Sequence, residues 1–283
     1  MIVSKKTMQN ISKPSISIAI FTCDDFSDLW ETNVFFLKKN FPIKSFEKII
    51  LVTDKPTIKK IDGIEIIWPT DFPDHLNKLK CLIDKCQTKY FLFTLDDYFF
   101  IKQISQEFIN SCIKFMTDTD ANYLKLNIRH YSKTKTPQIS YNMKFYTLRT
   151  ELPYALDLYP SIWNTKFASE TVDKWIFPER TIWHYEGKLY KLNQFMSLNK
   201  CYCVKSKNFC FEDVIRKGGL LNHAHSVLYN KFSIDLTKTR RLRTKREDFK
   251  NKIDCFISAW TPLFIKSIIK NRLRKKGKKF YSD

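Results

Sequence analysis

Short apolar runs of strand length recur along the first half of the chain. Residues 15–23 (SISIAIFTC) alternate small and β-branched side chains, as a buried first strand does. Residues 48–54, 64–68 and 90–95 are further apolar runs bounded by charged or turn-forming residues. The pattern therefore predicts four strands before residue 96.

Amphipathic segments separate these runs. Residues 72–86 place Leu76, Leu79, Leu82 and Ile83 on one helical face. Asp28 and Glu31 have the spacing of a capping box at the start of another helix. Residues 105–117 predict a third helix and residues 122–128 a fifth strand. Strand and helix thus alternate to about residue 128, which predicts an α/β fold with a parallel sheet and helices on both faces.

Acidic residues follow several of the predicted strands. Residues 23–25, Asp54 and the pair Asp96–Asp97 all lie at strand carboxyl ends, where open parallel sheets bind their ligands. Two adjacent carboxylates at the mouth of a buried strand repel each other and lose hydration when buried. The pair is therefore expected either to hold a cation or to lie on a solvated turn, and the pattern leaves both interpretations open.

Composition limits the possible functions. The 283 residues are 43% hydrophobic, enough for a large core. Only five glycines are present, and they form neither a dinucleotide-binding nor a P-loop motif. Three cysteines and two histidines between residues 201 and 225 match none of the usual zinc frameworks. No apolar run is long enough to span a membrane, so we expect a cytoplasmic protein with reduced cysteines.

The net charge of +20 is spread unevenly. Residues 236–283 hold 16 Lys and Arg against 4 Asp and Glu, which leaves +8 on the first 235 residues. We expect a basic, mainly helical C-terminal tail at 236–283 after a catalytic domain at 1–235, itself divided into halves at about 15–130 and 131–235. Residues 262–283 suit either the interface of an anionic membrane, as in a peripheral membrane protein, or a solvated helix packed through its apolar stripe.

The order of the motifs resembles that of the inverting GT-A glycosyltransferases of bacterial polysaccharide and lipopolysaccharide assembly. The resemblance covers roughly residues 15–190 and rests on the ordered set FTCDD, ILVTDKP, FLFTLDDYFF, YPSIWN and WHYE. It implies a GT-A-like, Rossmann-like fold and the transfer of a sugar from a nucleotide-sugar donor, in the synthesis of capsule, lipopolysaccharide or another cell-surface glycan. The implied acceptor is a glycan or a lipid-linked glycan, and the implied cofactor is Mn²⁺ or Mg²⁺.

The resemblance also implies roles for individual residues. Asp96 and Asp97 match the acidic motif that holds the metal ion and the donor diphosphate, although Leu95 stands where the common Asp-x-Asp form has its first acid. Other matching positions imply nucleoside contacts at Thr22, Asp24 and Asp54, and an acceptor or sugar pocket lined by Tyr159, Ser161, Trp163 and Trp183. Aromatic side chains suit such pockets because sugar ring faces stack on them, but most aromatic residues in a chain like this one belong to the core.

An inverting transfer needs one base to deprotonate the acceptor hydroxyl as it attacks the anomeric carbon. Glu186 of WHYE is the implied base, Glu179 of WIFPE is an alternative, and His184 is a rival of another residue type. Two other classes of function remain open. The basic run at 238–246 favours a nucleic-acid-binding protein, and the same fold can also serve as a catalytically inactive scaffold.

Overall fold

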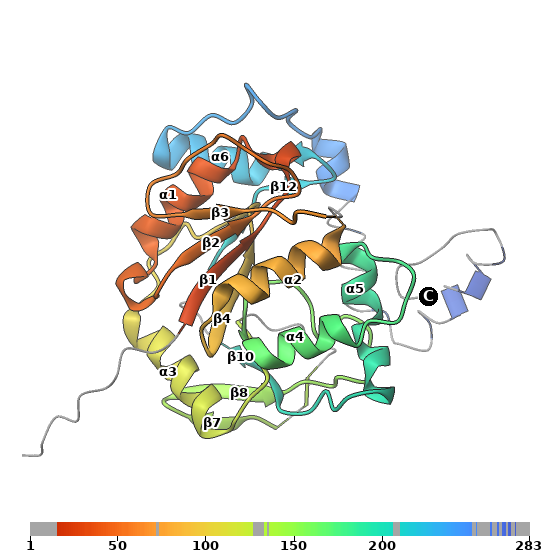
Figure 1. Ribbon diagram of the computed structural model, residues 1–283. Coiled ribbons are helices and arrows are strands. Elements are labelled where there is room, and N and C mark those ends of the chain that lie inside the picture. Colours follow the sequence, from red (N-terminus) through yellow and green to blue (C-terminus); the bar gives the residue numbers. More distant parts are fainter. Residues whose placement is uncertain are drawn as a thin grey trace, which may run out of the picture.

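The computed structural model describes residues 16–71, 74–126, 133–134, 136–205 and 210–250, and a few separate positions after residue 250. A nine-stranded sheet forms its centre (Figure 1). Its strands are β1 (Ile16–Phe21), β2 (Ile49–Val52), β3 (Glu65–Ile67), β4 (Tyr90–Leu95), β6 (Tyr123–Lys125), β7 (Gln138–Ser140), β8 (Met143–Thr147), β9 (Ser161–Asn164) and β10 (Cys201–Lys205). Their order across the sheet is β3-β2-β1-β4-β9-β6-β10-β8-β7.

The sheet is mostly parallel, as the alternation of strand and helix predicts. β3, β2, β1 and β4 pair in parallel, and β10 pairs in parallel with β6. β9 runs antiparallel to both β4 and β6, and β8 runs antiparallel to both β10 and β7. All five strands predicted before residue 130 form. β9 lies in an aromatic segment whose periodicity is too weak to predict a strand.

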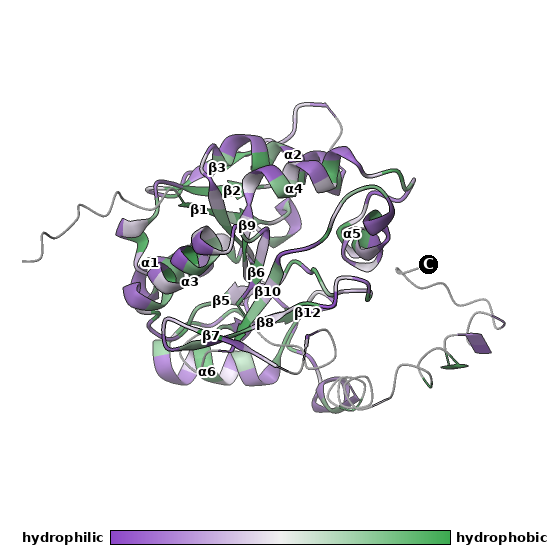
Figure 2. Cartoon of the chain, turned by 90° about the horizontal axis from the view of Figure 1, so that it is seen from below, coloured by the Kyte–Doolittle hydropathy of each residue, from purple (hydrophilic) through white to green (hydrophobic). Residues whose placement is uncertain are grey.

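Helices cover both faces of the sheet (Figure 2). Ile16, Ile18 and Ile20 of β1 pack against α1 (Trp30–Asn40) and α3 (Gln106–Asp118). Ala19 and Phe21 point to the other face, which is covered by α2 (His75–Cys86), α4 (Thr165–Asp173) and α5 (Ile182–Lys188). The strict alternation along β1 follows from the two-residue period of a strand.

Side-chain caps begin most of these helices. Asp74, Ser105 and Asn164 each accept a hydrogen bond from the backbone of the first turn of α2, α3 and α4. The capping box expected at Asp28 is wrong, because the N-cap of α1 is Leu29 and no side chain caps it. The carboxylate of Asp28 instead receives the guanidinium of Arg240, so a tertiary contact replaces the local one.

A smaller core joins the region after β4 to the C-terminal part of the chain. β5 (Tyr98–Phe99) pairs with β11 (Glu212–Asp213), and a hairpin of β12 (Ile215–Arg216) and β13 (Gly219–Leu220) follows. α6 (Asn222–Phe232) lies beside α1 (Figure 1), where Leu228 and Ala224 are buried with Phe36 and Phe99. This arrangement brings Asp213 next to the Asp96–Asp97 turn.

Three short 3-10 helices complete the described structure: η1 (Asp24–Phe26), η2 (Ile43–Ser45) and η4 (Leu189–Gln194). Residues 245–250 are helical, whereas most of 251–283 lies outside the described residues, so the expected helical tail and the domain limits remain predictions. Within the part of the chain that the structure describes, no helix has both the length and the apolar composition needed to cross a bilayer.

Candidate donor-binding site

The acidic loops predicted to meet at one edge of the sheet do meet there. β2, β1 and β4 are neighbours, and the pairs Phe21↔Val52 and Phe21↔Leu95 bring their carboxyl ends to the same level. Thr22, Asp54 and the Asp96–Asp97 turn therefore follow three adjacent strands, which is the position where open α/β sheets bind ligands.

Asp96 is held inside the protein. Its carboxylate accepts a hydrogen bond from the hydroxyl of Thr22, which in turn accepts one from Trp30 Nε1 at 2.7 Å. Only 6% of Asp96 and 4% of Thr22 is exposed. Burial raises the pKa of Asp96 to about 7, and the hydrogen bond from Thr22 and the charge of Lys78 oppose that rise only in part. The interpretation of this carboxylate as a group on a solvated turn is therefore wrong.

Asp97 is less well satisfied than its neighbour. Its Oδ1 is buried and has no hydrogen-bond partner among the described residues. Burial and the negative charges of Asp96 and Asp213 raise its pKa well above the usual range, while Arg216 acts in the opposite direction. A buried acceptor without a partner costs about 1–3 kcal/mol. A proton or a bound cation would remove that cost.

The residues at this edge supply some of the ligands that a hard divalent cation needs, but not all of them. Asp97 offers an oxygen without a partner, and Asp213, whose pKa burial raises to about 6, lies close enough to affect it. Within the described residues, no three His, Cys, Asp or Glu side chains form a group able to hold a metal ion. Mg²⁺ is commonly held by one or two carboxylates together with phosphate oxygens and waters, so two carboxylates suffice only if the ligand supplies the rest.

Asp54 fixes the loop that follows β1. Its Oδ1 accepts a hydrogen bond from the backbone N–H of Asp24 at 2.6 Å. Burial alone would raise the pKa of Asp54, yet this hydrogen bond and the nearby Lys78 leave it below the usual range. The carboxylate of Asp24 points outward to Lys55, at 3.8 Å. Asp54 is thus ionised and partly engaged by the protein, whereas Asp24 is partly exposed at the mouth of the site.

Lys78 completes the electrostatics of the site. It is 1% exposed, its Nζ donates to the carbonyl oxygen of Thr22 at 2.5 Å, and it lies 4.3 Å from the ring centroid of Phe21. Burial lowers its pKa, and the charges of Asp54, Cys23 and Asp96 act to raise it. A buried lysine with carboxylates around it supplies positive charge at the end of β1.

The sequence reasoning missed Lys78, although a signal for it was available. Lys78 lies four residues before Leu82, which places it on the buried stripe of α2. It also missed Asn33 of α1, whose amide donates to the carbonyl oxygens of Asp96 and Tyr98, both at 3.0 Å. No local sequence pattern predicts these contacts of Asn33, because the partners are more than 60 residues apart.

Tyr98, Tyr159 and Glu186 form one neighbourhood beside the acidic pair. The rings of Tyr98 and Tyr159 stack with centroids 5.2 Å apart, and Phe211 lies 4.7 Å from Tyr98. Burial raises the pKa of Tyr98, and the nearby Tyr159, Asp97, Asp213 and Glu186 raise it further. Glu186 Oε1 accepts a hydrogen bond from the N–H of Leu158 at 2.6 Å. Glu186 is half-buried, and its charge acts on Tyr98, the residue that follows the acidic pair in the chain.

Two residues expected to line the sugar pocket are part of the core instead. Ser161 is 0% and Trp163 2% exposed, and Trp163 Nε1 donates to Ser161 Oγ at 2.9 Å. Trp163 stacks on Phe91, with centroids 6.5 Å apart. Both lie in β9, between two neighbouring strands, so no accessible surface remains for a sugar. Trp183 is 53% exposed on α5.

The rival bases are held by other contacts. Glu179 receives Lys188 Nζ at 2.8 Å, and this hydrogen bond lowers the pKa of Glu179, which makes it a weaker base. His184 Nδ1 lies 2.7 Å from the hydroxyl of Thr181, the N-cap of α5. Glu186 lies inside α5, so the helix orients its carboxylate.

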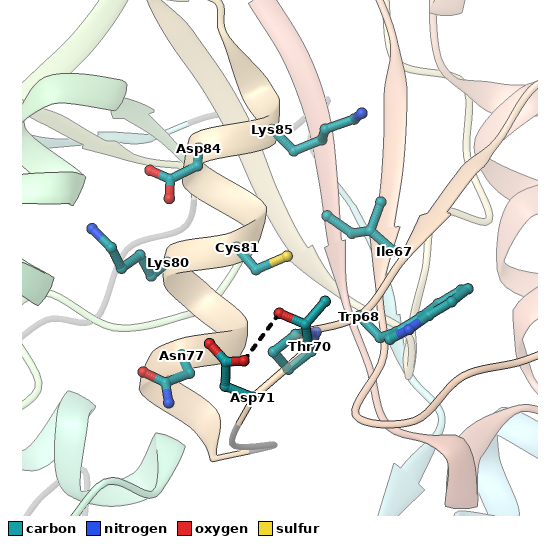
Figure 3. Close-up of a pocket in the computed structure, with 10 residues that line it drawn as sticks. Ile67, Trp68, Thr70, Asp71, Asn77, Lys80, Cys81, Asp84 and Lys85 are labelled. Carbon is teal, nitrogen blue, oxygen red and sulfur yellow. Dashed lines mark hydrogen bonds between the residues drawn. The ribbon is translucent and has the colours of Figure 1, made fainter.

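A groove of about 820 Å³ lies between α2 and the residues at and after the end of the edge strand β3 (Figure 3). Trp68 and Cys81 face it, together with Lys80, Asp84 and Lys85. None of the residues proposed for donor binding, metal binding or catalysis lines it. A second cavity, of about 430 Å³, is lined by Asp213, Asn222 and Phe249 among others, and it adjoins the acidic edge through Asp213.

No model of a known protein family matches the chain, and no curated protein matches it in sequence. Similar solved structures include Staphylococcus aureus TarS (residues 1–349) in complex with UDP-GlcNAc, at 15% identity and a TM-score of 0.46 over 73% of this chain and 60% of that one. Another is the mannosyltransferase PcManGT from Pyrobaculum calidifontis in complex with GDP-Man and Mn²⁺, at 12% identity and a TM-score of 0.43 over 72% of this chain and 58% of that one. The chain spans less than two thirds of each of these proteins.

Proposed function

We propose that the protein is a glycosyltransferase that moves a sugar from a nucleotide-sugar donor to a glycan or lipid-linked glycan acceptor. The observation that carries the proposal is the unsatisfied oxygen of Asp97, in a buried acidic pair at the carboxyl edge of β4. Such a pair is stable in its ionised form only with a cation, and a metal-bound diphosphate supplies that cation and the missing ligands together.

The remaining residues of the edge suit the other parts of such a donor. Asp54 and Asp24 lie beside the end of β1, in reach of a nucleoside, and Asp54 is ionised and able to accept hydrogen bonds from ribose or base. Lys78 adds positive charge beneath the loop. Mn²⁺ or Mg²⁺ held by Asp96 and Asp97 would neutralise the charge that develops on the departing diphosphate.

Glu186 is the proposed base for an inverting reaction. Two observations support this role: the charge of Glu186 acts on Tyr98, which follows the acidic pair, and Tyr98 stacks on Tyr159. The hydrogen bond from Leu158 N–H fixes one of its oxygens, which restricts the orientation of the carboxylate that would take the acceptor proton. We assign the protein to the synthesis of bacterial cell-surface glycans, on the cytoplasmic side of the membrane.

Nucleic-acid binding is less well supported. Three arginines of the basic run at 238–246 have intramolecular acidic partners: Arg240 binds Asp28, Arg241 binds Glu247, and Arg243 binds Asp248. Their charge is therefore largely matched within the chain, which leaves less of it for phosphates.

The test is a thermal-shift panel of nucleotide sugars, each with and without Mn²⁺ or Mg²⁺. A donor at 100 times its Kd should stabilise the protein by about 2.7 kcal/mol. Asp97→Asn should remove the metal-dependent part of that shift, because an amide is a much weaker ligand for a hard cation. Asp62→Asn, at a fully exposed carboxylate, is the matched control. A panel without any nucleotide-dependent shift, or an Asp97→Asn variant that responds like the wild type, would contradict the proposal.

A further inference from the structure

The segment that follows α6 is fixed to the body of the protein. Leu236 is buried in the small core with Phe36 and Phe99. Further on, the N–H of Leu220 donates to the carbonyl of Arg241, and the N–H of Arg243 donates to the carbonyl of Leu220, both at 2.9 Å. These bonds place the segment alongside β13, in a parallel bridge between Leu220 and Leu242. Residues 236–248, here called the strap, thus have a defined position at the edge of the site.

Arg240 of the strap binds the loop between β1 and α1. Its Nε lies 2.9 Å from Asp28 Oδ2 and its Nη2 lies 2.5 Å from Asp28 Oδ1, a bidentate pair, and Nη2 also donates to the carbonyl of Asp25. The guanidinium lies 4.5 Å from the ring centroid of Phe26. Both charged side chains are mostly buried, at 13% exposed for Arg240 and 21% for Asp28. Bidentate arginine–carboxylate pairs combine strength with a fixed orientation.

This loop contains residues proposed to bind the nucleoside. It begins at Cys23 and includes Asp24, whose N–H binds Asp54. Its 3-10 helix has no side-chain cap, and neither has the start of α1. Arg240 therefore supplies the loop with a side-chain anchor at a position where local caps are absent.

Arg243 anchors the strap to the β12–β13 hairpin. Its Nη1 donates to the carbonyl of Arg216 at 3.0 Å, and its Nε donates to Asp248 at 2.8 Å. A Cβ on Gly219 would lie 2.8 Å from Arg243 Cγ, so the side chain passes directly over the β12–β13 hairpin. This hairpin follows Asp213 and Val214. The N–H of Val214 donates to the carbonyl of Asp97 at 2.9 Å. The strap thus contacts both the nucleoside loop and the segment beside the acidic pair.

We infer that the strap is part of the donor-binding machinery, with Arg240 as the positioning residue that holds the Asp24 loop in its binding geometry. The inference uses the proposed function only for the identity of the ligand. It assigns residues 236–248 to the catalytic unit, although charge alone groups them with the basic tail. Arg240 acts through Asp28 and the loop rather than through contact with the reacting atoms.

The first test measures the loop itself and needs no ligand. Hydrogen exchange of backbone amides 23–29 should be about tenfold faster in Arg240→Gln than in the wild type, because the loop loses its anchor. Arg241→Gln is the matched control, since the neighbouring arginine pairs with the 37%-exposed Glu247 at the surface. Asp28→Asn removes the other half of the pair and should give the same acceleration. Equal exchange at 23–29 in the wild type, Arg240→Gln and Asp28→Asn would overturn the inference.

The second test measures the donor. Arg240→Gln should weaken binding of the nucleotide sugar that gives the largest shift in the panel by about 10- to 100-fold, the range expected for a misplaced binding group. KM for the donor should rise by a similar factor, with kcat changed much less. Arg240→Lys should recover only part of the affinity, because an ammonium cannot form the bidentate pair. If the wild type binds no nucleotide, the proposed function is wrong, but the exchange test of the loop still holds. If Arg240→Gln binds the donor with wild-type affinity, the role inferred for the strap is wrong.

Discussion

Asp96 and Asp97 are neighbours in the chain but have different surroundings. Asp96 is tied to Thr22 and Trp30 inside the protein, whereas Asp97 has a buried oxygen without a partner in the described part of the chain. One oxygen of Asp96 is therefore engaged within the protein, whereas Asp97 offers a buried oxygen to an external cation. At the residue scale, the two carboxylates of the proposed metal site differ in how much of each remains for a ligand.

The high pKa of Asp96 predicts a pH-dependent stability. A carboxyl whose pKa is about 7 in the folded protein and 3.8 in the unfolded chain stabilises the fold fully below 3.8, and this contribution is lost as pH rises through 7. Asp96→Asn, which mimics the neutral form, lacks this loss. In urea titrations without metal, the free energy of unfolding of the variant should rise relative to that of the wild type between pH 4 and pH 8. The rise should be on the order of 4 kcal/mol.

The control for this prediction is Asp62→Asn, at an exposed carboxylate that pairs with Lys38 of α1. Its stability difference from the wild type should stay nearly constant over the same range. A constant difference for Asp96→Asn as well would show that Asp96 is ionised in the folded protein at all these values of pH.

At the scale of elements, α5 decides how Glu186 is presented. Thr181 caps the helix by accepting a hydrogen bond from His184 N–H, and the buried Tyr185 and Leu189 pack it against the sheet. Glu186 follows Tyr185 on the half-buried side and reaches the N–H of Leu158, in the segment that leads into β9. Two elements therefore fix the carboxylate from opposite directions, which is the support that a positioned base needs.

Replacing the proposed base should affect catalysis and leave donor binding unchanged. Glu186→Gln should lower kcat by about 10²-fold or more, within the range for a lost general base. The nucleotide-sugar Kd should change little, because the base acts on the acceptor. Glu179→Gln and His184→Ala are the controls, and both should remain active. If Glu179→Gln is the inactive enzyme and Glu186→Gln the active one, the base is Glu179.

At the scale of the whole molecule, the positive charge of the C-terminal part falls into two groups. In residues 236–250, Arg240 pairs with Asp28 of the body, and Arg243 pairs with Asp248 of the same segment. Residues 262–283 add eight Lys and Arg among apolar side chains, and most of them lie outside the described residues. Their sequence suits either contact with an anionic surface, where a lipid-linked acceptor would be found, or a solvated helix packed through its apolar stripe.

Deleting residues 262–283 tests this membrane role. The full chain should sediment with liposomes that contain anionic lipid, and the shortened chain should bind them more weakly, because about eight positive charges are lost. Raised salt should weaken the binding of the full chain, since surface charge is screened. Equal sedimentation of the two chains would show that the body, or no part of the protein, binds the membrane.

The sequence alone was sufficient for the local features of residues 15–128. The strands up to residue 128 and the amphipathic helices α2 and α3 follow from apolar periodicity, because a two- or 3.6-residue period reports which side of each element is buried. The position of Asp54 and Asp96–Asp97 at strand ends is likewise local information. Their meeting follows from one further rule, that parallel strands present their carboxyl ends at a common edge.

Only the tertiary structure decided which side chains meet across long separations. Asp28 has the spacing of a cap but pairs with Arg240, 212 residues later. Trp163 is an aromatic residue that could stack on a sugar but is buried, because α2, α4 and α5 cover the face of the sheet to which it points. Lys78 joins the site because α2 packs its stripe beneath the end of β1. Periodicity reports burial and not partners, so contacts between distant segments are fixed only when the elements pack.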